Sequence, residues 1–559
     1  MKKIVYILLP ILSASIASCS LKEDIRSGSM PVSYYKDAMQ CQTGLNGCYN
    51  VFKSMVDHNN YWYGTECQSD IIQQTASAQY DAYCDISSSS PRFGTTIWDN
   101  GYRGVSRVNS MLVAIDSAYA AKGINEEEYN YLYGEGVVLR AYFYYLLTNT
   151  FGDVPFYEER VTGANNLEIA HLPRMSADDT RRKLVAELRE WLLERKALPL
   201  MPTYSSENPK RYRMGAAVGL TLAGNMCMWL KEWAQARDFY EALEDIYGTG
   251  AGNPEGTLER YPLSDIPFRN KYTPESIWEV ANEWQPYGIR ITSTLASKCT
   301  PQRGTTNPDE EEADEEEDDH SDYYYEVGIP ELGNLARTNS PARPTSHFYK
   351  DLMPYNSGDR RRSTYTANGP VQDGGGYLAT GWMGYSKQDD RSKVAPHWLY
   401  FKGLKETSQP YLGDKFWCFG MIHTYDSNNF KLLRYASVVL HLAEVYLMQG
   451  DDAKACAYLN QIKRRAGIKE VQPADFVDAE ALLEEIQNEN ARELFGEFQR
   501  KYELVRWGIW YRNVKEKGWG GSTLKNNAMP CHEYYPIADA QVTYSGGALD
   551  NKAYNEYGL

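Results

Sequence analysis

The chain has 559 residues, a formal net charge of −16 and 45 tyrosines with 13 tryptophans. A chain of this length can bury a large core and corresponds to roughly two to four domain-sized units. Its acidic balance argues against nucleic acid as a partner, because a phosphate backbone would be repelled. Tyrosine is an amphipathic contact residue suited to polar, flat ligands, and its abundance is the main anomaly of the composition.

A secretory signal peptide is expected at the start of the chain. Lys2 and Lys3 precede a largely apolar run over residues 4–12, and small residues continue to residue 18. This run is too short to span a bilayer of about 30 Å, which needs roughly 20 apolar residues. Residues 1–18 are therefore predicted to be removed on export.

Cys19 ends the step Ile-Ala-Ser-Cys, which resembles a bacterial lipobox. Its thiol would carry a diacylglycerol, since buried acyl chains hold a protein firmly on a membrane; an ordinary signal peptide with a chance cysteine is the alternative. Residues 19–33 are expected to form a flexible lipidated tether. Glu23 and Asp24 resemble the surface-export signal of Bacteroidetes lipoproteins, which implies a lipid-anchored protein of the outer membrane that faces the outside.

Helical periodicity covers both outer parts of the chain. Apolar positions at helical spacing predict helices over 34–56, 98–112, 126–151, 176–196, 214–230, 232–247, 435–448, 451–466, 479–497 and 498–512. The pairs 214–247 and 435–466 combine small residues at helix crossings with an aromatic plug and a tight turn. Tetratricopeptide-type helix pairs need these features, and generic antiparallel packing is the alternative.

The stretch over 251–430 is rich in Gly, Pro, Tyr, Trp and Asn, and segments such as 276–280 are predicted to be short strands. A long irregular region inside a folded chain is usually functional or disordered, and here the aromatic residues favour order. The expected fold is mostly α, with a tetratricopeptide-like helical-pair scaffold and a large loop-rich ligand-binding part that contains short strands. The predicted division is a helical region over 34–250 with an aromatic loop at 58–95, an irregular insert over 251–430 with an acidic loop at 307–322, and a C-terminal helical region with a tail over 431–559.

Catalytic motifs are missing from the sequence, which has no GxSxG elbow, HExxH pair, Walker loop or GxGxxG after a strand. The eight histidines are scattered, so no cofactor is expected. The chain is predicted not to be an enzyme, although a carboxylate pair for glycoside hydrolysis could not be recognised from sequence. Nine cysteines besides Cys19 form no CxxC pair, and Cys41 and Cys48 are predicted to be buried thiols.

An acidic run over 309–322 holds eleven carboxylates and no lysine or arginine. It is interpreted as a solvated, self-repelling loop. A structural calcium ion is the alternative, because calcium prefers carboxylate oxygens, although the EF-hand spacing is missing. The candidate ligands for that ion are Asp309, Asp314, Asp318 and Asp319.

Aromatic clusters in the irregular segments predict a stacking surface. Sugar rings present C–H faces that stack on indole and phenol rings, while amides and carboxylates bind the hydroxyl groups. For any single residue, a buried core aromatic is the alternative. The candidate ligand-binding residues are Tyr61, Trp62, Tyr63, Tyr83, Trp284, Tyr287, Tyr323, Tyr324, Tyr325, Trp382 and Tyr385. Tyr80 belongs to the first cluster, and its polar neighbours are Asn59, Asn60, Asp70 and Asp81.

Five segments together resemble the SusD/RagB family of Bacteroidetes outer-membrane lipoproteins. The most specific is 136–155, which reads Gly-Val-Val-Leu-Arg-Ala-Tyr-Phe-Tyr-Tyr-Leu and then Phe-Gly-Asp-Val-Pro. The others are 98–109, 434–467, 489–507 and 535–554. The resemblance covers nearly all of the mature chain, with Asp550 and the acidic insert as departures.

The resemblance implies a SusC-like TonB-dependent transporter as partner, on which the lipoprotein sits as a lid. The predicted function is non-catalytic capture of an oligo- or polysaccharide at the cell surface and its delivery to that transporter. A peptide-capturing subunit of a RagAB-like import complex is the alternative. The shared motifs look structural, and the expected buried ion pairs are Arg140 with Asp153, Glu444 with Arg465, and Glu493 with Arg506.

Overall fold

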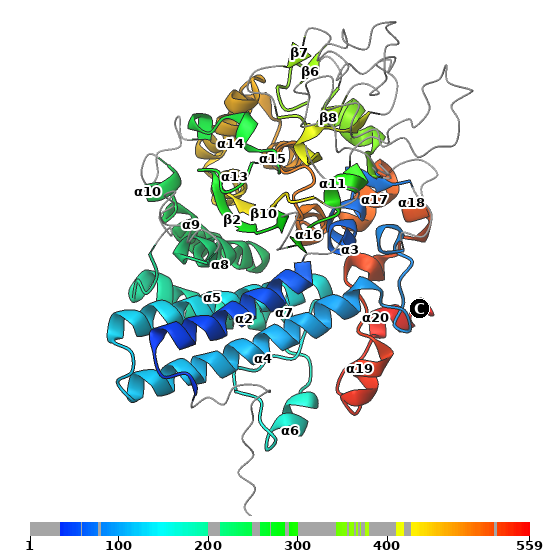
Figure 1. The fold of residues 1–559 in the computed structure, drawn as a ribbon. Helices are drawn as coiled ribbons and strands as arrows, with labels where there is room; N and C mark the ends of the chain where they lie inside the picture. Colours follow the sequence, from blue (N-terminus) through cyan, green and yellow to red (C-terminus); the bar gives the residue numbers. More distant parts are fainter. Residues whose placement is uncertain are drawn as a thin grey trace, which may run out of the picture.

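The computed structural model describes residues 34–56, 59–75, 80–199, 213–248, 258–268, 270–284, 290–299, 342–354, 357–362, 365–366, 369–370, 375–379, 410–418, 426–518 and 523–559. Over these residues the protein is mostly helical, as predicted. Figure 1 shows a layer of long helices at one end and a second group of helices with short strands beyond it. None of the helices in the described ranges is long and apolar enough to cross a membrane.

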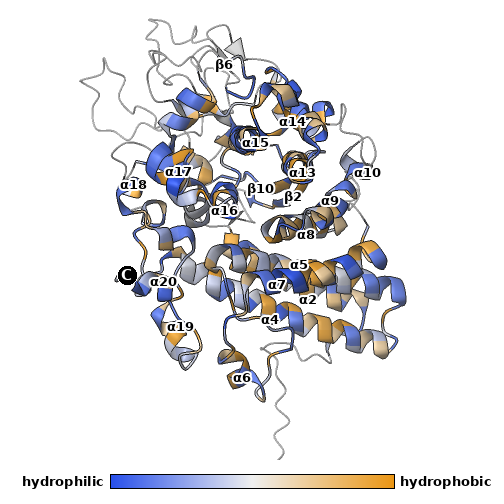
Figure 2. Cartoon of the chain, turned by 180° about the vertical axis from the view of Figure 1, so that it is seen from behind, coloured by the Kyte–Doolittle hydropathy of each residue, from blue (hydrophilic) through white to orange (hydrophobic). Residues whose placement is uncertain are grey.

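Four helices form the first layer: α2 (Ala38–Val56), α4 (Phe93–Ala120), α5 (Glu126–Phe151) and α7 (Ala177–Leu188). α5 packs against the other three and is buried over most of its length. It begins at a capping box, in which the Asn125 side chain accepts from the Glu128 N–H and the Glu128 carboxylate accepts from the Asn125 N–H. In Figure 2 α2, α4 and α7 show both hydrophobic and hydrophilic residues, as expected of helices with one buried face.

The two predicted helix pairs are present as α8 (Ala216–Leu230) with α9 (Trp233–Glu241), and α13 (Tyr435–Met448) with α14 (Asp452–Ala466). α13 also packs against α9, so the two pairs lie side by side. Gly224 allows a close crossing, because a Cβ at this position would lie 2.4 Å from the Tyr240 ring. Stacked helix pairs of this kind make the scaffold tetratricopeptide-like.

The C-terminal part adds α15 (Ala479–Glu493), α16 (Arg500–Arg506) and α17 (Trp510–Lys517). The predicted single helix over 498–512 is wrong, because Gly508 has a φ of +71° and separates two helices there. The helix predicted over 176–196 also changes character, since residues 189–194 form a π-helical turn. The shorter helices are α3 (Asn59–Trp62), α6 (Asn166–Ala170), α10 (Glu244–Tyr247), α11 (Leu295–Cys299), α18 (Thr523–Asn527), α19 (Asp539–Tyr544) and α20 (Lys552–Asn555).

The strands of the described part are short and form antiparallel pairs. The longest pair joins β2 (Ser276–Val280) to β10 (Phe430–Arg434), which confirms the strand predicted at 276–280. The other pairs are β1 (Ile72–Gln74) with β5 (Ala342–Pro344), β3 (Glu283–Trp284) with β4 (Arg290–Ile291), β6 (Tyr365–Thr366) with β7 (Gly369–Pro370), and β8 (Leu378–Ala379) with β9 (Tyr411–Leu412). The residues at 249–257 lie outside the described ranges, and the division of the chain near 250 and 430 stays a prediction.

The predicted pair of Arg140 with Asp153 is wrong. Arg140 forms an ion pair with Glu187 and donates to Asn109 Oδ1 at 3.1 Å. Asp153 instead accepts from the Ala177 N–H at 2.8 Å, at the start of α7. The motif residues therefore join α5 to its neighbours through different partners than expected.

The other two predicted pairs exchange partners. Arg506 Nη2 lies 2.6 Å from Glu444 Oε2, and Arg465 Nη2 lies 2.5 Å from Glu493 Oε1. Glu493 also accepts from Arg434 Nη1 at 2.7 Å. The prediction of buried ion pairs is correct for these residues, but their order along the chain did not reveal which helices cross.

All nine described cysteines are buried and carry free thiols. Cys41 and Cys48 both lie on α2 and are fully buried, which confirms that they are not a disulfide. Burial raises the pKa of Cys41 to about 11 and that of Cys48 to about 12. These thiols therefore behave as small core residues rather than nucleophiles.

Candidate functional site

Strand β1 lies where several segments that are distant in the sequence contact one another. β1 pairs with β5, with Ile72 opposite Pro344 and Gln74 opposite Ala342. β5 also packs against β9 and α11, and loop 80–92 packs against β1 and α18. We call this region, made of β1, β5, β9, α11 and loop 80–92, the β1 edge.

The predicted stacking residues Tyr61, Trp62 and Tyr63 are core residues, with only 4%, 1% and 2% of their surface exposed. The Tyr61 ring stacks on Phe498, with centroids 5.6 Å apart. Trp62 Nε1 donates to the Gly496 carbonyl at 3.0 Å. Because C-terminal residues cover this segment, the three side chains do not form the predicted ligand surface.

The two acidic neighbours predicted beside the first cluster are also used inside the protein. Arg500 binds both oxygens of Asp70, at 2.8 and 2.9 Å. Burial alone would raise the pKa of Asp70, but the Arg500 guanidinium prevails and lowers it to about 2. Asp81 is 3% exposed, and burial raises its pKa to about 6.

Two aromatic residues of the first cluster remain accessible at the β1 edge. Tyr80 is 42% exposed, and Tyr83 is half-buried. Burial raises the pKa of Tyr83, with a further contribution from Cys67. Tyr80 and Tyr83 are therefore the members of this cluster that a ligand could reach.

Arg92 joins Tyr80 on this surface and was not predicted. Its guanidinium carbon lies 4.0 Å from the centroid of the Tyr80 ring, and its Nε donates to the Asp85 carbonyl at 3.3 Å. Arg92 has φ 52° and ψ −125°, a backbone conformation that non-glycine residues rarely adopt. Such strain persists only where the surroundings enforce it and is common in ligand-binding loops. No sequence pattern marks this arginine, because its placement depends on the fold.

Residues that flank three other predicted aromatic clusters also lie in or beside the β1 edge. α11 ends at Cys299 and β5 begins at Ala342, on either side of the stretch with the tyrosine triplet. Ala379 precedes Trp382, and β8 pairs with β9, which packs against β5. The β3–β4 hairpin, which contains Trp284, leads into α11. The flanks of these clusters, distant in sequence, are therefore brought together.

Several predicted residues lie outside the described ranges. They are Cys19, Tyr287, Tyr323, Tyr324, Tyr325, Trp382, Tyr385, Asp309, Asp314, Asp318 and Asp319, and for Trp284 only the backbone is described. Over the described ranges, no group of three or more His, Cys, Asp or Glu residues is arranged to hold a metal ion. The calcium alternative for the acidic loop stays a prediction.

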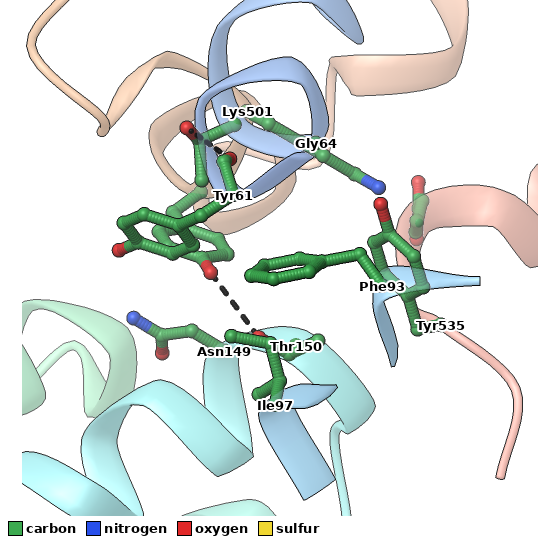
Figure 3. Close-up of a pocket in the computed structure, with 11 residues that line it drawn as sticks. Tyr61, Gly64, Phe93, Ile97, Asn149, Thr150, Lys501 and Tyr535 are labelled. Atoms are coloured by element: carbon green, nitrogen blue, oxygen red, sulfur yellow. Dashed lines mark hydrogen bonds between the residues drawn. The ribbon is translucent and has the colours of Figure 1, made fainter. Parts of the chain in front are cut away.

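Figure 3 shows a small pocket whose lining includes Tyr61, Phe93, Lys501 and Tyr535. The space in it that the centre of a water molecule can occupy is only about 10 Å³, which is room for about one water molecule. Burial lowers the pKa of Lys501 to about 8. The cavity is too small for a sugar ring, so a ligand of that size would bind at the exposed surface instead.

The accessible groups at the β1 edge include the phenol rings of Tyr80 and Tyr83, the Arg92 guanidinium and the Asp85 carboxylate. Together they can stack on a flat polar ligand and bond to its hydroxyl groups. The fold defines a helical scaffold protein, and its loops at the β1 edge present a candidate ligand surface.

Two sequence families match the chain. The SusD family matches residues 420–554, and a family described as "Starch-binding associating with outer membrane" matches residues 23–217. The SusD-like protein P25 of Formosa agariphila is 24% identical over 99% of this chain and 98% of its own length. The chain belongs to the SusD/RagB family.

Solved structures share the fold. Surface glycan-binding protein A from Bacteroides uniformis superposes with a TM-score of 0.64 at 18% identity, over 92% of this chain and 99% of its own. The protein of that name from Bacteroides thetaiotaomicron, in complex with laminarihexaose, superposes with a TM-score of 0.63 at 16% identity, over 92% and 98%. These similarities confirm the predicted fold class.

Proposed function

We propose that this protein is a non-catalytic, lipid-anchored glycan-binding protein of the cell surface, which captures an oligo- or polysaccharide and delivers it to a SusC-like TonB-dependent transporter. The observation that carries the proposal is the exposed Tyr80–Arg92 stack at the β1 edge, on the scaffold of a SusD/RagB protein. Relatives named as glycan-binding proteins, one of them in complex with laminarihexaose, support the choice of ligand class.

The geometry favours modest affinity. An open surface with few stacking rings leaves little net free energy after the ligand and its contact side chains are ordered. Stacking of a nucleic-acid base on an aromatic side chain contributes roughly 1–3 kcal/mol when measured by alanine substitution, and we expect a similar scale for a sugar ring. Loss of Tyr80 should therefore remove most of the measurable binding.

Calorimetry on laminarin, soluble starch, xylan and pectin tests the proposal. We expect one or more of these glycans to bind, and Tyr80→Ala to weaken that binding at least tenfold. Tyr544→Ala is the matched control, because Tyr544 is 72% exposed on α19, outside the β1 edge. No binding across the panel, or equal loss in both variants, would contradict the assignment. Peptides found by mass spectrometry on the purified transporter complex would favour peptide capture instead.

A further inference from the structure

A C-terminal segment, residues 534–559, packs against loop 80–92. The Asp539 N–H donates to the Ser88 carbonyl at 3.0 Å, and Ser88 Oγ donates to the Leu559 carbonyl at 3.3 Å. Figure 1 shows α20 beside this loop, at the side of the molecule. The loop that carries the ligand surface therefore rests on the last part of the chain.

Tyr535 is a buried residue of this C-terminal segment that reaches toward loop 80–92. Its N–H donates to the Thr150 carbonyl at 2.7 Å, which fixes its backbone at the end of α5. Two glycines leave room for its side chain: a Cβ at Gly64 would lie 2.7 Å from the phenol oxygen, and a Cβ at Gly94 would lie 2.9 Å from the ring. In Figure 3 Tyr535 lies next to Phe93, at one side of the cavity.

The Tyr535 hydroxyl reaches Asp81, and Asp81 holds the strained residue of the loop. Asp81 Oδ1 accepts from the Tyr535 hydroxyl at 3.2 Å and from the Phe93 N–H at 3.1 Å. Phe93 directly follows Arg92, whose unusual φ and ψ must be enforced by neighbouring contacts. Asp81 and Phe93 supply such a contact on the side of α4.

We propose that Tyr535 is a positioning residue for the ligand surface: its hydroxyl orients the Asp81 carboxylate, which holds Arg92 in its strained conformation and so keeps the guanidinium on the Tyr80 ring. The link to binding rests on the proposed function, because it requires that the Tyr80–Arg92 stack contacts ligand. The effect of Tyr535 on the geometry of loop 80–92 does not depend on the proposed function.

Hydrogen exchange on the full chain tests the loop without any ligand. Tyr535→Phe removes one oxygen and keeps the ring, and we expect amides of 80–93 to exchange roughly threefold to tenfold faster, as for the loss of one hydrogen bond. Tyr554→Phe is the matched control, because its hydroxyl donates to the Tyr534 carbonyl at 2.6 Å rather than to loop 80–92. Unchanged exchange in Tyr535→Phe, or equal acceleration in both variants, overturns the inference.

A pH profile separates positioning from a general loss of stability. The Tyr535 hydroxyl lowers the pKa of Asp81, as does Arg92, against the dominant effect of burial. Lys501 and Cys84 also interact electrostatically with this carboxylate. In Tyr535→Phe the Asp81 titration should move to higher pH, whereas a merely structural tyrosine would leave it in place.

Binding is the last measurement. If laminarin binds the wild type, Tyr535→Phe should weaken it roughly threefold to tenfold and Tyr554→Phe should not. Equal affinity of wild type and Tyr535→Phe overturns the link to the ligand surface. If no glycan of the panel binds the wild type, the proposed function fails while the exchange experiment still decides the role of Tyr535.

Discussion

The helical layer and the strand-containing part of this molecule are held together by different interactions. In the layer, α5 buries apolar and small residues against α2, α4 and α7, which lie within about a hundred residues of it in the chain. Around β2 and β10, the core contains an extended network of paired charges, larger than the Arg140–Glu187 pair that joins α5 to α7. The comparison shows that the part with the least regular structure depends most on contacts between residues distant in sequence.

Arg434 is at the centre of that charged core. At the end of β10 it lies 2.8 Å from Glu275, 2.7 Å from Glu493 and 2.6 Å from Glu497. Arg361 joins the same network through Glu493, at 2.8 Å. A buried charge without its partners is strongly destabilising, so every member depends on the others.

Neutralising Glu493 should have the largest effect on stability. Three arginines lower its pKa well below the ordinary range despite burial, so its charge stabilises the fold at neutral pH and that contribution is lost as pH falls below about 4.5. We expect Glu493→Gln to lower the free energy of unfolding by about 3–5 kcal/mol in urea titrations at pH 7. Glu480→Gln, an exposed change on the same helix, should stay within about 0.5 kcal/mol. An effect below about 1 kcal/mol would mean that the charge network contributes little to the stability of the strand-containing part.

Asp81 gives an intermediate, pH-dependent test near the proposed ligand surface. Its folded pKa of about 6 lies above its ordinary value, so the native state binds the proton more tightly and stability falls as pH rises from about 4 to 6. The free energy of unfolding of the wild type relative to Asp81→Asn should decrease by up to about 3 kcal/mol over that range. Urea titrations at pH 4, 5, 6 and 7 measure this difference, and parallel profiles for the two proteins would contradict it.

The helical layer should respond least to a single polar change. Asn125→Ala removes the capping box of α5 and should cost about 1 kcal/mol. Asn130→Ala, on the same helix, removes no cap and is the control. Thermal unfolding of both variants measures the effect. A loss for Asn125→Ala as large as that for Glu493→Gln would remove the distinction between the two regions.

Much of the scaffold could be predicted from sequence because helical periodicity and caps are local signals. The helix pair around Gly224 and the strand at 276–280 follow from such patterns. The predicted helix over 498–512 is wrong because apolar periodicity alone does not show that Gly508 adopts a positive φ and separates α16 from α17.

The candidate ligand surface was harder to predict, because burial of an aromatic residue depends on distant segments. Tyr61 and Trp62 stand in an irregular polar stretch that is typical of a loop, yet Gly496 and Phe498, more than 400 residues later, contact them. Arg92 gave no sequence signal for a similar reason, because the C-terminal segment 534–559 and Asp81 determine its conformation. The ion pairs of Glu444 and Glu493 were likewise assigned to the wrong arginines, since residue type predicts a charged partner but not its identity.

The nine buried thiols make the folded protein convenient for spectroscopy. Maleimide dyes react with exposed thiolates, and the described cysteines combine burial with unreactive, protonated sulfur. Once Cys19 is removed, a single cysteine introduced at Val477, which is 92% exposed, would therefore accept a fluorophore at one known place without removal of the nine described cysteines. A second cysteine in place of Tyr544, on α19, would give a donor–acceptor pair that reports distances across the molecule in one labelling step.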